Sequence, residues 1–497
     1  MKKIQSLTFY KDPRFILTLI LAVFFLKGVF LAVAYPIFTG QDETRHYNTI
    51  QYMSEPENKT WDINILSDEE RAAQDKDNLG TYRFSEEIKN TAIAVDNDIL
   101  RSDMFNTIVF SDSYDGINET EINSKLWEPI NYDYPPDITG RNGQNLYHQL
   151  GTFIEKMFAD ENILIRFYLI RIFSVLLGTL TVFFSYLIIR ETGFQPKYGL
   201  LMTAIIAFQP KFSSYVTNIN YAPLLFLFFA TFTLGGILYL KKGLDWKNMS
   251  LMVISVFLGM RTKGTAIVLA AMLIFLLAFM IYKKISAKNN KIKHLPVLLF
   301  FLASSLILFF FQKYLPLVYV SGISEIFSSL GNYLKESLTI GKMALSARTY
   351  WGTLSWVDNR FLENATDFIW IVQAFAIIGL GLLFFSKKPY PDFLPDKKYV
   401  VFLIVMIAAL QAGVRLADWM YFAKSGNLEL GAPGRYFLPN LAAHIILVFT
   451  GLGLLFERFF PGKGERYFNY SLILSLILMF AFTTYLIFDV IIFRFYL

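Results

Sequence analysis

The sequence contains no cysteine among its 497 residues. This absence excludes disulfide bridges, thiolate metal sites and cysteine nucleophiles. Charged residues are also scarce, at 17% of the chain, whereas 54% of the residues are hydrophobic and the mean hydropathy is +0.42. A soluble protein of this length is seldom so apolar, so the composition predicts an integral membrane protein.

Several motifs are also missing. The chain has no glycine-rich nucleotide-binding loop, no zinc-ligand spacing and no Ser-His-Asp order, so we expect no nucleotide cofactor. The net charge of +6 is uneven, because residues 36–165 hold 25 Asp and Glu against 10 Lys and Arg. The basic residues gather beside apolar runs, which is typical of membrane-flanking loops and not of nucleic-acid binding.

Apolar runs long enough for transmembrane helices recur along the chain. They predict an all-α polytopic membrane protein with about eleven transmembrane helices and a large loop after the first. The first run lacks a small-residue cleavage site, so we expect an anchor and not a cleaved signal peptide. The expected spans cover residues 14–35, 167–188, 198–210, 221–240, 248–260, 265–282, 295–312, 366–385, 399–414, 434–456 and 470–494.

The stretch 248–282 is too long for one span. A single helix would place Arg261 and Lys263 at the bilayer centre, at a cost of roughly 2.5–3.5 kcal/mol each. Two shorter helices that turn at Arg261-Thr262-Lys263-Gly264 avoid this cost. Apart from Arg166, Arg171, Arg415 and Asp418 near helix ends, we expect the spans to lack ionisable residues.

Basic clusters fall in alternate loops, and the positive-inside rule makes these loops cytoplasmic. The rule predicts a cytoplasmic N-terminus. We expect the protein to lie in the plasma membrane of the cell. The segments 36–165, 211–220, 261–264, 313–365 and 415–434 then lie on the extracytoplasmic face. The expected parts of the chain are residues 1–35 with the first span, an acidic loop over 36–165, spans over 166–312, a loop over 313–365 and spans over 366–497.

The first candidate for chemistry is Gln41-Asp42-Glu43-Thr44-Arg45-His46-Tyr47, just beyond the first span. A helix beginning near Gly40 would place Asp42, Arg45 and His46 on one face. Asp42 could then deprotonate a hydroxyl, and Asp42 with His46 could hold a divalent ion. The alternative is an ordinary helix start, at which the helix dipole favours acidic residues.

Three further segments carry cations or aromatic residues on the same expected face. Arg261 and Lys263 suit a phosphate, or they could snorkel to lipid headgroups. Arg348, Tyr350 and Trp351 could line a sugar site or belong to an aromatic belt. The segment Gly434-Arg435-Tyr436 places an arginine at a helix start, which is unfavourable unless an anion offsets it. Asn218 could contact substrate or cap a helix.

This order of features resembles the GT-C superfamily of glycosyltransferases, which use polyprenyl-phosphate sugars. More closely, it resembles a bacterial membrane family whose first loop reads P-D-E-P-x-H, although the flanking prolines are absent here. The supporting segments run from about residue 36 to 440. They are 41–47, Arg171 to Gly178, Phe208 to Phe212, Thr262-Lys263-Gly264, Tyr350-Trp351-Gly352 and Gly434 to Pro439.

The resemblance implies an inverting transfer of a hexose or pentose to an extracytoplasmic glycan, lipid or protein. It assigns Asp42 as general base, assisted by Glu43 and His46 with a divalent cation such as Mg²⁺ or Mn²⁺. Arg261, Lys263 and Arg435 would bind the donor phosphate. Arg348, Tyr350, Trp351, Tyr436 and Asn218 would contact the sugar or other substrate groups.

Two other functions remain open at this point. An O-antigen-type polymerase would use a diphosphate-linked donor. A transporter or flippase for polyprenyl-linked glycans would place its ionisable residues at mid-depth in the membrane. The carboxylates and cations would gather at one membrane surface in an enzyme, so their position separates these functions.

Overall fold

The computed structural model describes residues 12–40, 42–54, 87–88, 91, 145–243, 245–286, 323–352, 360–385, 389–426, 428 and 432–492. Within these ranges the chain forms helices and no strands. The first half comprises α1 Pro13–Ala34, α2 Glu43–Ser54, α5 Leu146–Met157, α6 Ile163–Glu191, α7 Pro196–Ala207, α8 Pro210–Tyr215, α9 Ala222–Lys242, α10 Trp246–Thr262, η5 Gly264–Ala266 and α11 Ile267–Ser286. The second half comprises α13 Ile323–Ser337, α14 Ile340–Trp351, α15 Arg360–Phe385, α16 Lys397–Ser425, η8 Gly434–Asn440, α17 Leu441–Phe459, α18 Gly464–Tyr485 and the π-helical segment η9 Leu486–Ile492.

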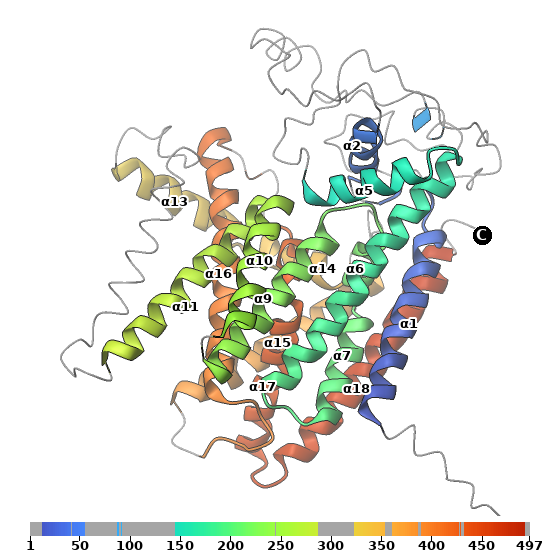
Figure 1. Cartoon of the computed structure of the whole chain (residues 1–497). Helices are drawn as coiled ribbons and strands as arrows, with labels where there is room; N and C mark the ends of the chain where they lie inside the picture. The colour runs from blue at the N-terminus through green and yellow to red at the C-terminus, as the bar shows by residue number, and fades with distance from the viewer. Residues whose placement is uncertain are drawn as a thin grey trace, which may run out of the picture.

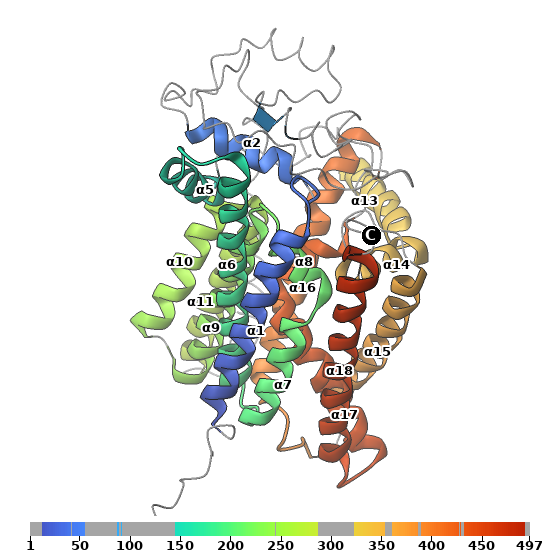
Figure 2. The same cartoon turned by 90° about the vertical axis from the view of Figure 1, so that its right-hand side faces the viewer.

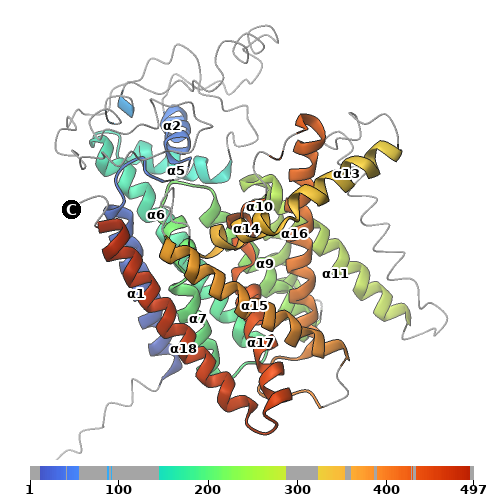
Figure 3. The ribbon, with the colours of Figure 1, turned by 180° about the vertical axis from the view of Figure 1, so that it is seen from behind.

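The long helices stand side by side as a bundle, and α2 and α5 lie across one end of it (Figures 1 and 2). We call this end the α2 end. The helices α1 and α18 overlap in the view of Figure 3, but α7 lies between them and contacts both (Figure 2). Near the α2 end, Leu31 and Ala34 of α1 share an apolar cluster with Phe482 and Leu486. Tyr35, the C-cap residue of α1, belongs to the same cluster.

Among the described residues, seven helices are long and apolar enough to cross a membrane, and α11 contributes a shorter apolar stretch. The protein is therefore an all-α membrane protein, as predicted. The number of eleven spans is not confirmed. The turn predicted between 260 and 265 is confirmed, because α10 ends at Thr262 and α11 begins at Ile267. The predicted span 295–312 lies outside the described residues, and α16 runs to Ser425, past the predicted end at 414.

The helix α1 is apolar all round but is buried on one side only. Leu19, Val23, Leu26, Phe30 and Val33 are exposed large apolar side chains, spaced three or four residues apart. Such a stripe is costly in water and is typical of a lipid-facing helix surface. The exposed stripe therefore supports a membrane environment.

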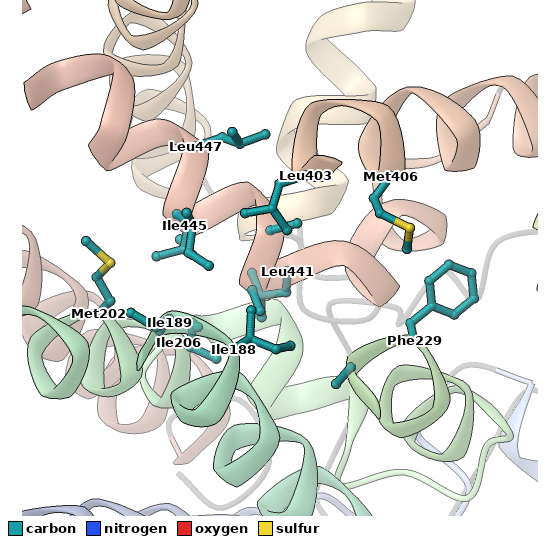
Figure 4. Close-up of a cluster of buried hydrophobic side chains, with 14 of the residues drawn as sticks. Ile188, Ile189, Met202, Ile206, Phe229, Leu403, Met406, Leu441, Ile445 and Leu447 are labelled. Carbon is teal, nitrogen blue, oxygen red and sulfur yellow. The ribbon is translucent and has the colours of Figure 1, made fainter. Parts of the chain in front are cut away.

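The centre of the bundle is filled by aliphatic and aromatic side chains from α6, α7, α9, α16 and α17 (Figure 4). Residues from the two halves of the chain meet here, with Ile188 and Met202 facing Leu403, Leu441 and Ile445 (Figure 4). All of these side chains are almost completely buried. This packing fixes the helices whose ends carry the candidate site.

One ionisable residue inside the first span contradicts the expectation from the sequence. Lys27 of α1 is partly buried, and its Nζ donates to the carbonyl of Ala207 at 2.5 Å and to Ser213 Oγ at 2.8 Å. Ala207 is the last residue of α7, so Lys27 satisfies a carbonyl that the helix end leaves unpaired. Lys27 thus holds α1 to the break between α7 and α8.

The helices α15 and α17 approach each other through glycine. A Cβ built at Gly379 would lie 1.9 Å from the Gly451 carbonyl oxygen, and one at Gly451 would lie 2.0 Å from that of Ala376. Small residues at such crossings let helix backbones touch in a membrane, where close packing drives association. No side chain larger than hydrogen fits at either position.

We expect Gly379→Ala to lower the thermal unfolding midpoint of the purified protein in detergent. The added methyl group must push α15 from α17, and overpacking of this kind costs about 1–3 kcal/mol. The control is Gly381→Ala on the same helix, where a Cβ would meet nothing within 4 Å. Equal midpoints for the two variants would contradict the close crossing.

Candidate functional site

Asp42 precedes α2 in an unusual backbone conformation. Its φ is +55°, in the left-handed region that most residues avoid. Aspartate tolerates this region better than most residues, and strain of this type costs of order 1–3 kcal/mol. The carbonyl of Asp42 accepts the backbone N–H of His46 at 3.1 Å, while its side chain is exposed. The helix start therefore leaves the carboxylate at the surface of the α2 end.

Glu43 is in a different environment from its neighbour. Its side chain is fully buried and forms a two-point ion pair with Arg171 of α6, at 2.8 Å from Nε and 2.6 Å from Nη2. It also accepts the backbone N–H groups of Gly40 at 2.9 Å and Ile219 at 2.8 Å. These four donors occupy both carboxylate oxygens.

Arg171 uses its remaining donors on backbone carbonyls. Nη1 donates to Ala32 at 2.8 Å and to Tyr35 at 2.5 Å, and Nη2 donates to Pro36 at 2.8 Å. These carbonyls lie at or just beyond the end of α1, where a helix leaves its last carbonyls unpaired. All five N–H donors of the guanidinium are thus engaged. Glu43 therefore has the contacts of a structural anchor, and its predicted role as a catalytic partner of Asp42 stays a prediction.

Three cations lie over tyrosine rings near Asp42. Lys211 Nζ of α8 is 5.6 Å from the Tyr215 ring centroid, Lys263 Nζ is 4.3 Å from that of Tyr221, and Arg435 Cζ is 5.0 Å from that of Tyr436. We call these six residues together with Asp42 the cation–tyrosine cluster.

The members of the cation–tyrosine cluster lie close enough for their charges to interact. Asp42 interacts electrostatically with Arg435. Tyr215 and Tyr221 feel the charges of both residues, and Lys211 feels that of Arg435. Four separate segments therefore converge at one place: the start of α2, the α8 region, the turn after α10 and η8.

The imidazole of His46 contacts a second histidine. His46 Nδ1 lies 2.9 Å from His148 Nε2 of α5, and both side chains are buried. The His46 ring also packs edge-on to Tyr221, with centroids 5.3 Å apart. Burial, with the nearby positive charges of Lys263 and Arg45, lowers the pKa of His46 to about 3. Both imidazoles are thus neutral near neutral pH, because the pKa of His148 is lowered too, mainly by burial.

The α2–α5 layer is held down by a second buried charge network. Arg166 of α6 donates to Glu155 of α5 and to Glu87, and Tyr47 donates to Glu155 at 3.1 Å. Glu87 also accepts from Gln51 of α2. Glu87 thus fixes one point of the acidic segment 36–165 directly against α2 and α6.

Three other predicted site residues have different surroundings. Asn218 is buried beside Gly40, where a Cβ would meet its Cγ at 2.7 Å. Arg261 is exposed, on the other side of Thr262 from Lys263. Arg348 is paired with Asp367 at 3.2 Å. Their predicted roles stay predictions.

Tyr350 and Trp351 are buried in the apolar core. The Tyr350 hydroxyl is 2.6 Å from Nδ1 of His444, and the Trp351 ring packs against the same imidazole at 5.8 Å. Gln373 contacts the other nitrogen of His444 at 3.0 Å. The predicted sugar contact by Tyr350 and Trp351 therefore stays a prediction, and the structure gives both residues a packing role.

Among the described residues, few others could complete a metal site at Asp42 and His46. Within the described ranges, no group of three or more His, Cys, Asp or Glu could hold a metal ion. Glu43, the nearest further carboxylate in the sequence, is committed to Arg171. The residues described do not fit a complete divalent-metal centre, and we derive no step through one.

Several residues of the site were not singled out by sequence reasoning. Lys211 and Arg171 stood inside segments that carried the family resemblance, but neither received a role. An arginine early in a long apolar run, as at 171, is costly unless a carboxylate pairs with it, and this is the signal that could have linked it to Glu43. The contact of His148 with His46 spans 102 residues and leaves no local pattern.

The helical membrane bundle, with a carboxylate and cations gathered at one end, has the features of a GT-C-type glycosyltransferase. Residues 166–309, under a third of the chain, match the family described as dolichyl-phosphate-mannose-protein mannosyltransferase. This match supports a multi-pass membrane glycosyltransferase that depends on a polyprenyl-phosphate sugar. No curated protein and no solved structure matches the chain.

The matched segment contains Arg171, Lys211, Tyr221 and Lys263. Much of the candidate site therefore comes from the part of the chain that resembles this family. Asp42 and Arg435 lie outside it. The closer resemblance to the bacterial family with a P-D-E-P-x-H loop stays a prediction.

We expect Arg171→Lys to destabilise the fold strongly. Lysine keeps the positive charge but cannot reproduce the two-point pair with Glu43 or reach three carbonyls at once, and a buried acceptor left without its donor costs about 1–3 kcal/mol. Thermal unfolding in detergent measures the loss, with Arg190→Lys at an exposed position of the same helix as control.

Glu43→Gln tests the anchor role separately. The amide would turn an N–H₂ donor toward Arg171, whose guanidinium also carries only donors. We therefore expect a lower unfolding midpoint together with a lower turnover. A Glu43→Gln protein that unfolds like the wild type but lacks turnover would instead make Glu43 catalytic.

Proposed function

We propose that this protein transfers a sugar from a polyprenyl-phosphate donor to a hydroxyl of an extracytoplasmic acceptor, with inversion and with Asp42 as general base. The observation that carries this proposal is the convergence of Asp42 with Lys211, Lys263 and Arg435 in the cation–tyrosine cluster. A base and a phosphate-binding site are the two parts that such a transfer needs.

The proposed reaction is a single displacement. The acceptor oxygen forms a bond to the anomeric carbon while its proton passes to the Asp42 carboxylate. The bond between the anomeric carbon and the phosphate oxygen breaks, and the lipid phosphate leaves with the electron pair. The charge that develops on the phosphate is the one that three cations would stabilise.

Lys211 replaces Arg261 as the third phosphate-binding cation in this proposal. It lies in α8, outside the candidate membrane spans. Burial, reinforced by the charge of Arg435, lowers the pKa of Lys211 to about 7. A bound phosphate would offset both effects and favour the charged ammonium. The lysine is therefore suited to gaining its charge together with the ligand.

The position of the cluster favours an enzyme over a transporter. The helix α2, which begins directly after Asp42, lies across the end of the bundle and not within it (Figure 2). A transporter would hold its substrate near the membrane midplane, between discontinuous helices. The placement of the only cluster carboxylate at the α2 end supports transfer at a membrane surface.

We expect Asp42→Asn to lower turnover of a polyprenyl-phosphate hexose by about 10²- to 10⁴-fold, since this is the usual contribution of a general base. The unfolding midpoint should not fall, because the carboxylate is exposed. Asp245→Asn, an exposed carboxylate without a capping bond before α10, is the matched control. Undiminished turnover in Asp42→Asn would refute this base.

We expect Lys211→Met and Arg435→Gln each to lower turnover by roughly 10²- to 10³-fold, the range seen on removing one donor to a developing charge. The measurement is transfer by purified protein from monophosphate and diphosphate lipid donors in parallel, with Lys242→Met at an exposed position as control. A preference for the diphosphate donor would instead favour a polymerase.

A further inference from the structure

The contact between His46 and His148 allows only two placements of the shared proton. Either His46 Nδ1–H donates to His148 Nε2, or His148 Nε2–H donates to His46 Nδ1, across 2.9 Å. A neutral imidazole carries one proton, so each choice also fixes the other nitrogen of both rings. Their environments decide between the two placements.

The far nitrogen of His148 is the deciding atom. Nδ1 of His148 is buried and has no hydrogen-bond partner among the described residues. If His46 were the donor, this Nδ1 would carry a buried N–H with no acceptor. If His148 is the donor, Nδ1 holds only an unused lone pair. Orphaned N–H groups are rarer in folded proteins than unused acceptors, which favours His148 as the donor.

The surroundings of His46 indicate what its remaining proton can do. With Nδ1 accepting from His148, the proton of His46 must lie on Nε2. This nitrogen has no hydrogen bond to any described residue, unlike Nδ1. The His46 ring packs on Tyr221, which lies under the ammonium of Lys263, so the imidazole borders the cation–tyrosine cluster.

We propose that His148 is a positioning residue that holds His46 as the Nε2–H tautomer, and that His46 thereby donates a hydrogen bond to a sugar or phosphate oxygen. This inference rests on the proposed function for the identity of the ligand. It replaces the predicted role of His46 as an assistant base, because an Nε2 that carries the proton cannot accept another. Neutral histidine donors of this kind serve as electrophiles in other enzymes.

The proton placement can be measured without any turnover. The chain contains four histidines, so ¹⁵N-histidine NMR of the protein in lipid nanodiscs gives few signals, which single His→Gln variants assign. We expect protonated Nε2 on both His46 and His148. A proton on Nδ1 of His46, or a charged imidazolium at either residue, would overturn the proposal. So would loss of the His46 Nε2 proton on addition of Mg²⁺, because the metal would then be the ligand.

Turnover separates a donor from a base. Glutamine carries an amide N–H₂ near the position of Nε2 but cannot act as a base. We expect His46→Gln to keep turnover close to that of the wild type, because glutamine retains a donor. His46→Leu should lower turnover by up to about tenfold, because it removes a neutral hydrogen bond, which contributes about 0.5–1.5 kcal/mol. Equal losses in the two variants would overturn the donor role.

The same comparison tests His148. His148→Gln retains a donor toward His46 Nδ1 and should preserve kcat, whereas His148→Leu should lower kcat with little change in KM for the donor. A loss in His148→Gln as large as that in His148→Leu would overturn the positioning role. The NMR result is independent of Asp42→Asn, so failure of the proposed function and failure of this inference are distinguishable.

Discussion

The buried ion pair between Glu43 and Arg171 determines where the rest of the candidate site can lie. It joins the end of α1, the start of α2, α6 and the backbone at Ile219. Removing two charges from water is costly, and such a pair is favourable only when every donor and acceptor is satisfied. Because it is satisfied here, α2 must begin where it does, and Asp42 is presented at the edge of the bundle.

Adjacent carboxylates therefore have opposite environments. Asp42 is exposed and strained in the left-handed region, whereas Glu43 is buried and saturated with donors. Glu43 thus stabilises the backbone conformation that Asp42 needs. Gly40 contributes to the same corner, because a side chain there would collide with both Glu43 and Asn218.

Much of the fold could be predicted from hydropathy, because a bilayer imposes the length of its helices. The turn at Lys263 followed from the cost of burying charge, and the structure confirms it. Long-range pairings could not be predicted in this way. Neither the contact of His148 with His46 nor that of Lys27 with Ala207 leaves a periodic signal, since each depends on how distant helices pack.

The hydrogen bond from Gln51 to Glu87 affects how well the chain tolerates changes in its length. The chain leaves α2 at Ser54 and is back in contact with the same helix at Glu87. Closing a loop costs only about 0.6 kcal/mol more for each doubling of its length. The contact of Glu87 with α2 should therefore tolerate insertions or deletions between these two points at a small cost in closure entropy.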